Sequence, residues 1–119
     1  MQGAQGDDKL DAFIGISGPY DLDNADILAI AFERRAIENY INHTIGEGVP
    51  FHDAAKAASP YWVTATSTPC PALLFNSTYE EIPASEMTSM ATYYGNAGGT
   101  IESYLRSGTE HGSDYWGLS

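Results

Sequence analysis

Asp11–Gly18 reads DAFIGISG, a short apolar run that Pro19 closes. An apolar run between turn-forming residues is typical of a strand that is covered on both faces, as in a parallel sheet. A second run, PALLFN at 71–76, predicts another buried strand. The alternating pattern of 100–105 predicts a third strand, nearer an edge of the sheet.

Helical patterns separate these strands. Apolar side chains recur at helical spacing over 26–41, where the pattern allows one break. Residues 51–58 predict a short helix that Ser59-Pro60 terminates, and a Thr-rich connector follows at 64–71. Pro83 suits the first turn of a helix over 84–94.

The order strand, helices, strand, helix, strand indicates the α/β class. Right-handed crossovers then give three parallel strands with helices on their faces. A sheet of three parallel strands leaves long edges open, because nothing within the sheet pairs with them. This expectation points to a missing partner segment or to a homodimer.

The composition excludes several classes of partner. The 119 residues include 43% hydrophobic side chains, which is ordinary for one globular domain. With 5 Lys and Arg against 16 Asp and Glu, the formal net charge of −11 opposes binding to nucleic acid or to anionic membranes. Residues 1–10, expected to be a flexible lead-in, lack the pattern of a signal peptide, and no run is apolar enough to cross a membrane. The localisation stays open.

Metal and cofactor sites are not expected. Cys70 is the single cysteine, so it cannot form an internal disulfide or a multi-cysteine zinc site, and it suits a small apolar filler. His43 and His52 have acidic neighbours but lack the spacing of a metal-binding motif. No glycine-rich phosphate-binding loop occurs either.

Four landmarks follow one another along the chain: FIGISGPYDL at 13–22, AASP at 57–60, PALLFN through Ile82-Pro83 at 71–83, and EHG at 110–112. Together they resemble the C-terminal half of an α/β-hydrolase-fold carboxylesterase of the esterase/lipase type, close to feruloyl and acetyl esterases. The resemblance covers about residues 11–116. It implies a partial α/β-hydrolase fold over 11–119, with the last three strands of an eight-stranded sheet and a helical cap at about 24–58.

The resemblance places a catalytic histidine after the last strand, where this sequence has His111. An imidazole is required at such a position because it takes a proton from a serine at neutral pH and returns it to the leaving alcohol. From the residues alone, a histidine in a glycine-bounded loop also suits a solvated loop residue.

The catalytic acid departs from the family pattern, because Tyr79 stands where the resemblance implies an aspartate. Glu80, one residue later and one methylene longer, is the expected acid. Glu81 is its neighbour but is expected to point to the opposite side. Asp21 and Asp23, at the end of the first strand, remain open as alternatives. Each of these carboxylates also suits a surface charge or a helix cap.

The nucleophile has no counterpart in the sequence. The family's elbow is G-x-S-x-G, and the nearest imitation, GISGP at 15–19, ends in proline without a helical pattern directly after it. Ser17 is therefore expected to be a strand-end residue. The oxyanion-hole segment is also absent, and in the family both features precede the strand that begins here at Asp11. Met1 is accordingly an internal methionine, an engineered start or the beginning of a truncated frame.

The resemblance implies a C-terminal portion of a serine carboxylic-ester hydrolase that acts on a small-molecule ester and is inactive by itself. Its expected partner is the missing N-terminal half. The alternative is a small non-catalytic α/β interaction module that dimerises through its open sheet edge. A peptidase of the same fold shares the late order of acid and histidine, and the acyl length of the ester stays open. Within the cap, five aromatic side chains suit either core packing or a substrate pocket: Phe32, Tyr40, Phe51, Tyr61 and Trp62.

Overall fold

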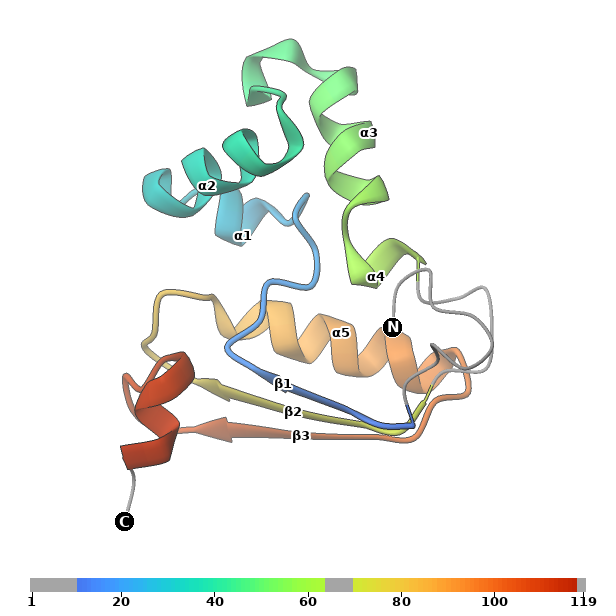
Figure 1. Cartoon of the computed structure of the whole chain (residues 1–119), viewed down its shortest axis with the longest axis vertical. Coiled ribbons are helices and arrows are strands. Elements are labelled where there is room, and N and C mark those ends of the chain that lie inside the picture. The colour runs from blue at the N-terminus through green and yellow to red at the C-terminus, as the bar shows by residue number, and fades with distance from the viewer. Residues whose placement is uncertain (1–10, 64–69, 118–119) are drawn as a thin grey trace.

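The computed structural model describes residues 11–63 and 70–117, which form a parallel sheet with flanking helices and a helical insertion (Figure 1). The strands lie in the order β1 (Phe13–Ile16), β2 (Ala72–Ser77) and β3 (Ile101–Arg106). Both strand pairs are parallel, so the predicted α/β class with three parallel strands is confirmed. The expected lead-in at 1–10 and most of the expected connector at 64–71 lie outside the described residues.

One face of the sheet packs against α5 (Ala84–Asn96), the helix that joins β2 to β3. The apolar stripe of α5 is buried together with the inward side chains of β2: Met87, Met90, Tyr94, Ala72 and Leu74. Side chains alternate along a strand, so the intervening residues point to the other face of the sheet. There Phe75 stacks on Tyr104, while Ile14 stays exposed. The exposed side chains of β3 agree with its predicted place at an edge.

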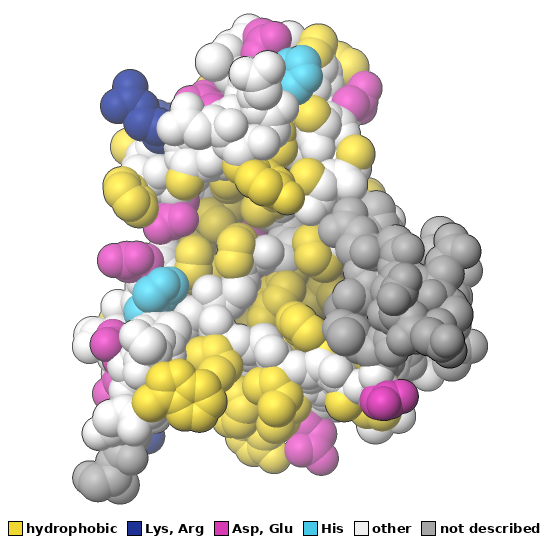
Figure 2. Space-filling model, viewed as in Figure 1, with side chains coloured by type: hydrophobic (Ala, Val, Ile, Leu, Met, Phe, Trp, Pro, Cys, Tyr) yellow, Lys and Arg dark blue, Asp and Glu magenta, His cyan; other side chains and the backbone are white. Residues whose placement is uncertain are grey.

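The insertion after β1 is a second lobe with its own core (Figures 1 and 2). The helix predicted over 26–41 is broken into α1 (Ala25–Leu28) and α2 (Ala31–Ile41), because Ile30 between them has extended backbone. A 3₁₀ turn, η2 (Ile45–Glu47), leads to α3 (Val49–Ala57). The prediction that Ser59-Pro60 ends the helical segment is incomplete, since Pro60 begins a further short helix, α4 (Pro60–Val63).

A buried carboxylate joins the two lobes. Glu86, in the first turn of α5, accepts hydrogen bonds from the backbone N–H groups of Tyr20 (2.8 Å) and Asp21 (2.7 Å), where the chain leaves β1 for the insertion. Only 1% of Glu86 is exposed. Burial raises the pKa of Glu86 to about 7, and the charges of Asp21 and Asp26 add to this while the two N–H donors oppose it. The attachment of the insertion therefore depends on a group that titrates near neutrality.

We predict that Glu86 makes stability depend on pH. Its pKa is higher in the folded chain, about 7, than the ordinary value of 4.5, so the folded state binds the extra proton between these values. The stability contributed by this group therefore falls as pH rises from about 4.5 to about 7, by on the order of 3 kcal/mol. Glu86→Gln should remove this dependence.

Urea unfolding across this pH range measures the effect as the difference between the wild-type chain and Glu86→Gln. Asp53→Asn is the matched control, because Asp53 is an exposed carboxylate on α3. We expect the control to keep the pH dependence of the wild type. Identical pH profiles for Glu86→Gln and the wild type would contradict the prediction.

Candidate active site

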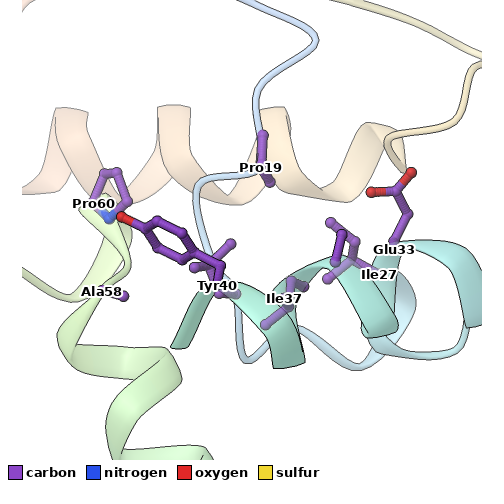
Figure 3. A pocket seen from close by; sticks show the side chains of 9 residues that line it. Pro19, Ile27, Glu33, Ile37, Tyr40, Ala58 and Pro60 are labelled. Carbon is purple, nitrogen blue, oxygen red and sulfur yellow. The ribbon is translucent and has the colours of Figure 1, made fainter. Parts of the chain in front are cut away.

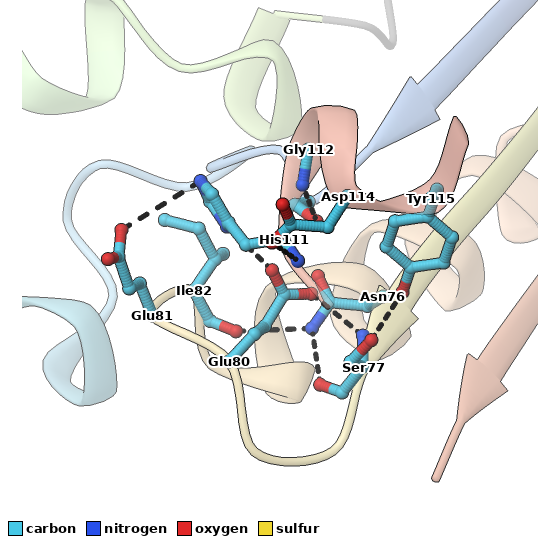
Figure 4. Close-up of polar contacts among 10 residues, drawn as sticks. Asn76, Ser77, Glu80, Glu81, Ile82, His111, Gly112, Asp114 and Tyr115 are labelled. Atoms are coloured by element: carbon cyan, nitrogen blue, oxygen red, sulfur yellow. Dashed lines mark hydrogen bonds and ion pairs between the residues drawn. The ribbon is translucent and has the colours of Figure 1, made fainter. Parts of the chain in front are cut away.

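Two loops at the carboxyl edge of the sheet bring Glu80 and His111 together (Figure 4). Glu80 lies in the turn after β2, and His111 lies in the loop after β3. Because neighbouring parallel strands end at the same edge, their following loops are adjacent. His111 Nδ1 is 2.7 Å from Glu80 Oε2. The two residues named from the sequence as base and acid are thus in hydrogen-bond contact.

The Glu80 carboxylate is fixed in its direction. Its side chain is 0% exposed, and Oε1 accepts a hydrogen bond from the backbone N–H of Ser77 at 2.7 Å. One oxygen is thereby held by the backbone, and the other faces the imidazole. A carboxylate at Nδ1 selects the tautomer that donates from Nδ1, which leaves Nε2 as the proton acceptor. The neutral His111 ring therefore accepts a proton at Nε2.

Buried polar side chains support the turn that carries Glu80. Asn76 Nδ2 donates to the backbone carbonyls of Ser77 and Ile82, each at 3.1 Å, and so closes the turn (Figure 4). Ser77 Oγ lies 2.6 Å from Tyr115 Oη, which connects the turn to the 3₁₀ helix η4 (Gly112–Gly117). The sequence analysis did not assign these residues a role. The available signal was an Asn-Ser pair at the end of an apolar run.

Glu81 takes a position that the sequence did not predict. Glu81 Oε2 lies 3.9 Å from His111 Nε2, on the other ring nitrogen from Glu80. The expectation that Glu81 points to the opposite side is therefore wrong in one respect, because its carboxylate stays beside the same imidazole. The Glu81 side chain is largely exposed, and 3.9 Å exceeds hydrogen-bond distance. The Glu81 carboxylate thus lies near Nε2 without forming a hydrogen bond to it.

The two other candidate acids are engaged within the insertion. Asp23 Oδ1 lies 2.5 Å from His52 Nδ1, which ties the start of the insertion to α3. Asp21 Oδ1 accepts a hydrogen bond from Trp62 Nε1 at 2.8 Å and another from the backbone N–H of Asp23. The structure therefore brings Glu80 to His111, whereas Asp21 and Asp23 bind other partners.

A cavity of about 370 Å³ opens in the insertion (Figure 3). Its lining is mainly apolar: Pro19, Leu22, Ile27, Ala36, Ile37, Tyr40, Ala58 and Pro60, with Glu33 as the carboxylate. Hydrophobic side chains gather in the hollow between the two lobes (Figure 2). Of the aromatic residues named from the sequence, Tyr40 lines the cavity, whereas Phe51 is fully buried in the insertion's core.

Glu33 connects the cavity to the histidine electrostatically. Burial raises the pKa of Glu33, the charge of Glu81 raises it further, and His111 opposes this. Charges influence one another in this way only at short range in water. The charges of Glu81 and His111 therefore both act on a carboxyl group that lines the cavity.

The described ranges 11–63 and 70–117 hold no group of three or more His, Cys, Asp or Glu side chains arranged for a metal ion. Within the same ranges, no helix has the length and apolarity needed to span a membrane. No protein-family model matches the chain, and no curated protein matches it significantly in sequence.

We predict that Glu80 sets the tautomer of His111. Glu80→Ala removes the acceptor at Nδ1, so the neutral ring should exchange between its two tautomers instead of holding the proton on Nδ1. Side-chain ¹⁵N NMR in alkaline solution distinguishes Nδ1–H from Nε2–H, and His43 and His52 are internal references. Glu81→Ala is the matched control and should leave the His111 signals unchanged. The same ¹⁵N pattern in Glu80→Ala and the wild type would refute this role.

Proposed function

We propose that this chain supplies the base and the acid of a serine carboxylic-ester hydrolase, with His111 as the base and Glu80 as the acid. The nucleophilic serine comes from another segment or chain. The observation that carries the proposal is the 2.7 Å contact of His111 with the fully buried Glu80 carboxylate at the carboxyl edge of a parallel sheet. The order of acid and then histidine along the chain is that of α/β-hydrolases.

In this mechanism Nε2 of His111 removes the proton from the serine hydroxyl as the serine oxygen attacks the ester carbonyl. The imidazolium then gives that proton to the departing alcohol, and a water molecule is activated in the same way to release the acid. Glu80 remains ionised, holds the ring and stabilises the imidazolium. The His111 side chain is 38% exposed, and Glu81 Oε2, at 3.9 Å, lies beyond hydrogen-bond distance of Nε2.

The cavity suits the apolar part of the ester. Its volume falls within the range of small-molecule sites, and its apolar wall excludes water from a bound hydrocarbon group. Glu33 lines the cavity and Glu81 lies beside His111, and these two carboxylates repel a ligand that carries a negative charge. We therefore propose an uncharged ester with a small or medium apolar group, in preference to an ester that carries a carboxylate.

A non-catalytic interaction module is the second candidate, because the sheet has unpaired edges among the described residues. β1 and β3 each pair with β2 on one side, and Ile14 and Tyr104 are exposed on the same face. Such edges pair readily with further strands. The second function does not require a reactive nitrogen on His111, so the reactivity of His111 distinguishes the two candidate functions.

We predict selective alkylation of His111 in the isolated chain. An apolar chloromethyl ketone should enter the cavity and alkylate Nε2, because binding raises the local concentration of the reagent at a nitrogen that carries no proton. The side chains of His43, His52 and His111 are similarly exposed, at 38%, 45% and 38%, so accessibility alone gives equal rates. We expect His111 to react about tenfold faster than either reference.

Peptide mass spectrometry after partial reaction gives the three rates within one sample. Tyr40→Ala, which removes an aromatic wall of the cavity, should lower the rate at His111 and leave the other two rates unchanged. Equal modification of the three histidines would exclude the hydrolase proposal and favour the interaction module. The coding DNA upstream of Asp11 offers an independent check, because the proposal requires a G-x-S-x-G segment there or on a partner chain.

A further inference from the structure

Ser17, at the end of β1, has a strained backbone. Its φ is 53°, in the left-handed region that residues with a Cβ atom rarely adopt. Ser17 is 5% exposed, so the strain occurs inside the structure and not at a free surface. A buried residue persists in such a conformation only where its surroundings hold it there. The contacts of Ser17 show which surroundings do so.

The Ser17 side chain contacts the histidine loop. Ser17 Oγ accepts a hydrogen bond from the backbone N–H of Gly112 at 3.0 Å, across 95 positions of sequence. Gly112 directly follows His111, so this N–H belongs to the peptide unit that begins with the His111 carbonyl. Holding this peptide plane restricts the backbone at the Cα atom from which the His111 side chain leaves.

The Ser17 backbone is meanwhile tied to the sheet. Its N–H donates to the carbonyl of Phe75 in β2 at 2.9 Å. The other polar contacts of the His111 backbone are local, between His111 N–H and the Asp114 carboxylate and between Asp114 N–H and the His111 carbonyl. Ser17 thus links the loop that carries His111 to the sheet that also positions Glu80.

We propose that Ser17 is a positioning residue for His111. Its hydroxyl holds the histidine loop so that Nδ1 stays on Glu80 while Nε2 remains available. This inference rests on the proposed role of His111 as the base. It also explains a serine in GISGP at 15–19, where the sequence imitates a nucleophile elbow without completing it. The hydroxyl serves as an acceptor for the loop backbone, and Ser17 is not the nucleophile.

Ser17→Gly tests this role without endangering the fold. Glycine adopts positive φ freely, so the substitution removes the hydroxyl and relieves the strain together. We expect an unchanged or higher urea midpoint. The alkylation rate of His111 by the apolar chloromethyl ketone should fall about tenfold, toward the rates of His43 and His52. The Gly112 amide should exchange with solvent faster, and the His111 ¹⁵N signals should show loss of the Nδ1–H tautomer.

Ser113→Gly is the matched control, because Ser113 is an exposed serine in the same loop region. It should leave the His111 rate and ¹⁵N signals at their wild-type values. If Ser17→Gly keeps a fast His111 reaction and the wild-type tautomer, the positioning role is refuted while the proposed function stands. If the three histidines react equally in the wild-type chain, both proposals are overturned. Labelling of Ser17 by a fluorophosphonate would also refute the positioning role.

Discussion

The site depends on one electrostatic requirement, which is that a carboxylate withdrawn from water must be satisfied by fixed donors. The side chain of Glu80 is 0% exposed, so its two oxygens need partners, and they find them in the Ser77 N–H and the His111 imidazole. The first partner belongs to the end of β2 and the second to the loop after β3. The buried charge therefore joins two loops that are separate in sequence, and Asn76 closes the turn that makes this possible.

A second buried glutamate, Glu86, has a different structural role. Glu86 also accepts backbone N–H donors, but these belong to the chain leaving β1, so this carboxylate secures the insertion against α5. The two glutamates differ in the partner of their second carboxylate oxygen. Glu80 directs it to an imidazole, whereas Glu86 Oε1 has no hydrogen-bond partner within the described chain. Burial is the main cause of the raised pKa of Glu86, and the charges of Asp21 and Asp26 add to it.

Apolar runs between turn-forming residues were enough to predict β1 and β2, and alternation was enough to predict β3. The expected cover on both faces was wrong for β1, because β1 lies at an edge of the sheet and Ile14 is 63% exposed. The contact of Glu80 with His111 was expected from the family resemblance, through the order of the matching segments along the chain. No spacing between nearby residues predicts this contact. The other contacts across long separations were not predicted. Asp23 meets His52 29 positions away, and Ser17 meets the N–H of Gly112 95 positions away, because both contacts depend on how whole elements fold back.

The division into two lobes has an evolutionary consequence. The cavity is lined mainly by the insertion, which has a hydrophobic core separate from that of the sheet, whereas the histidine and its carboxylate stand on loops of the sheet. Ile82, in the turn that carries Glu80, belongs to the core of the insertion, as do the cavity residues Leu22, Ile27 and Ile37. A lineage carrying this scaffold can drift toward bulkier or slimmer molecules through Ala36 and Tyr40, which line the cavity outside that core, and keep the Glu80–His111 contact unchanged.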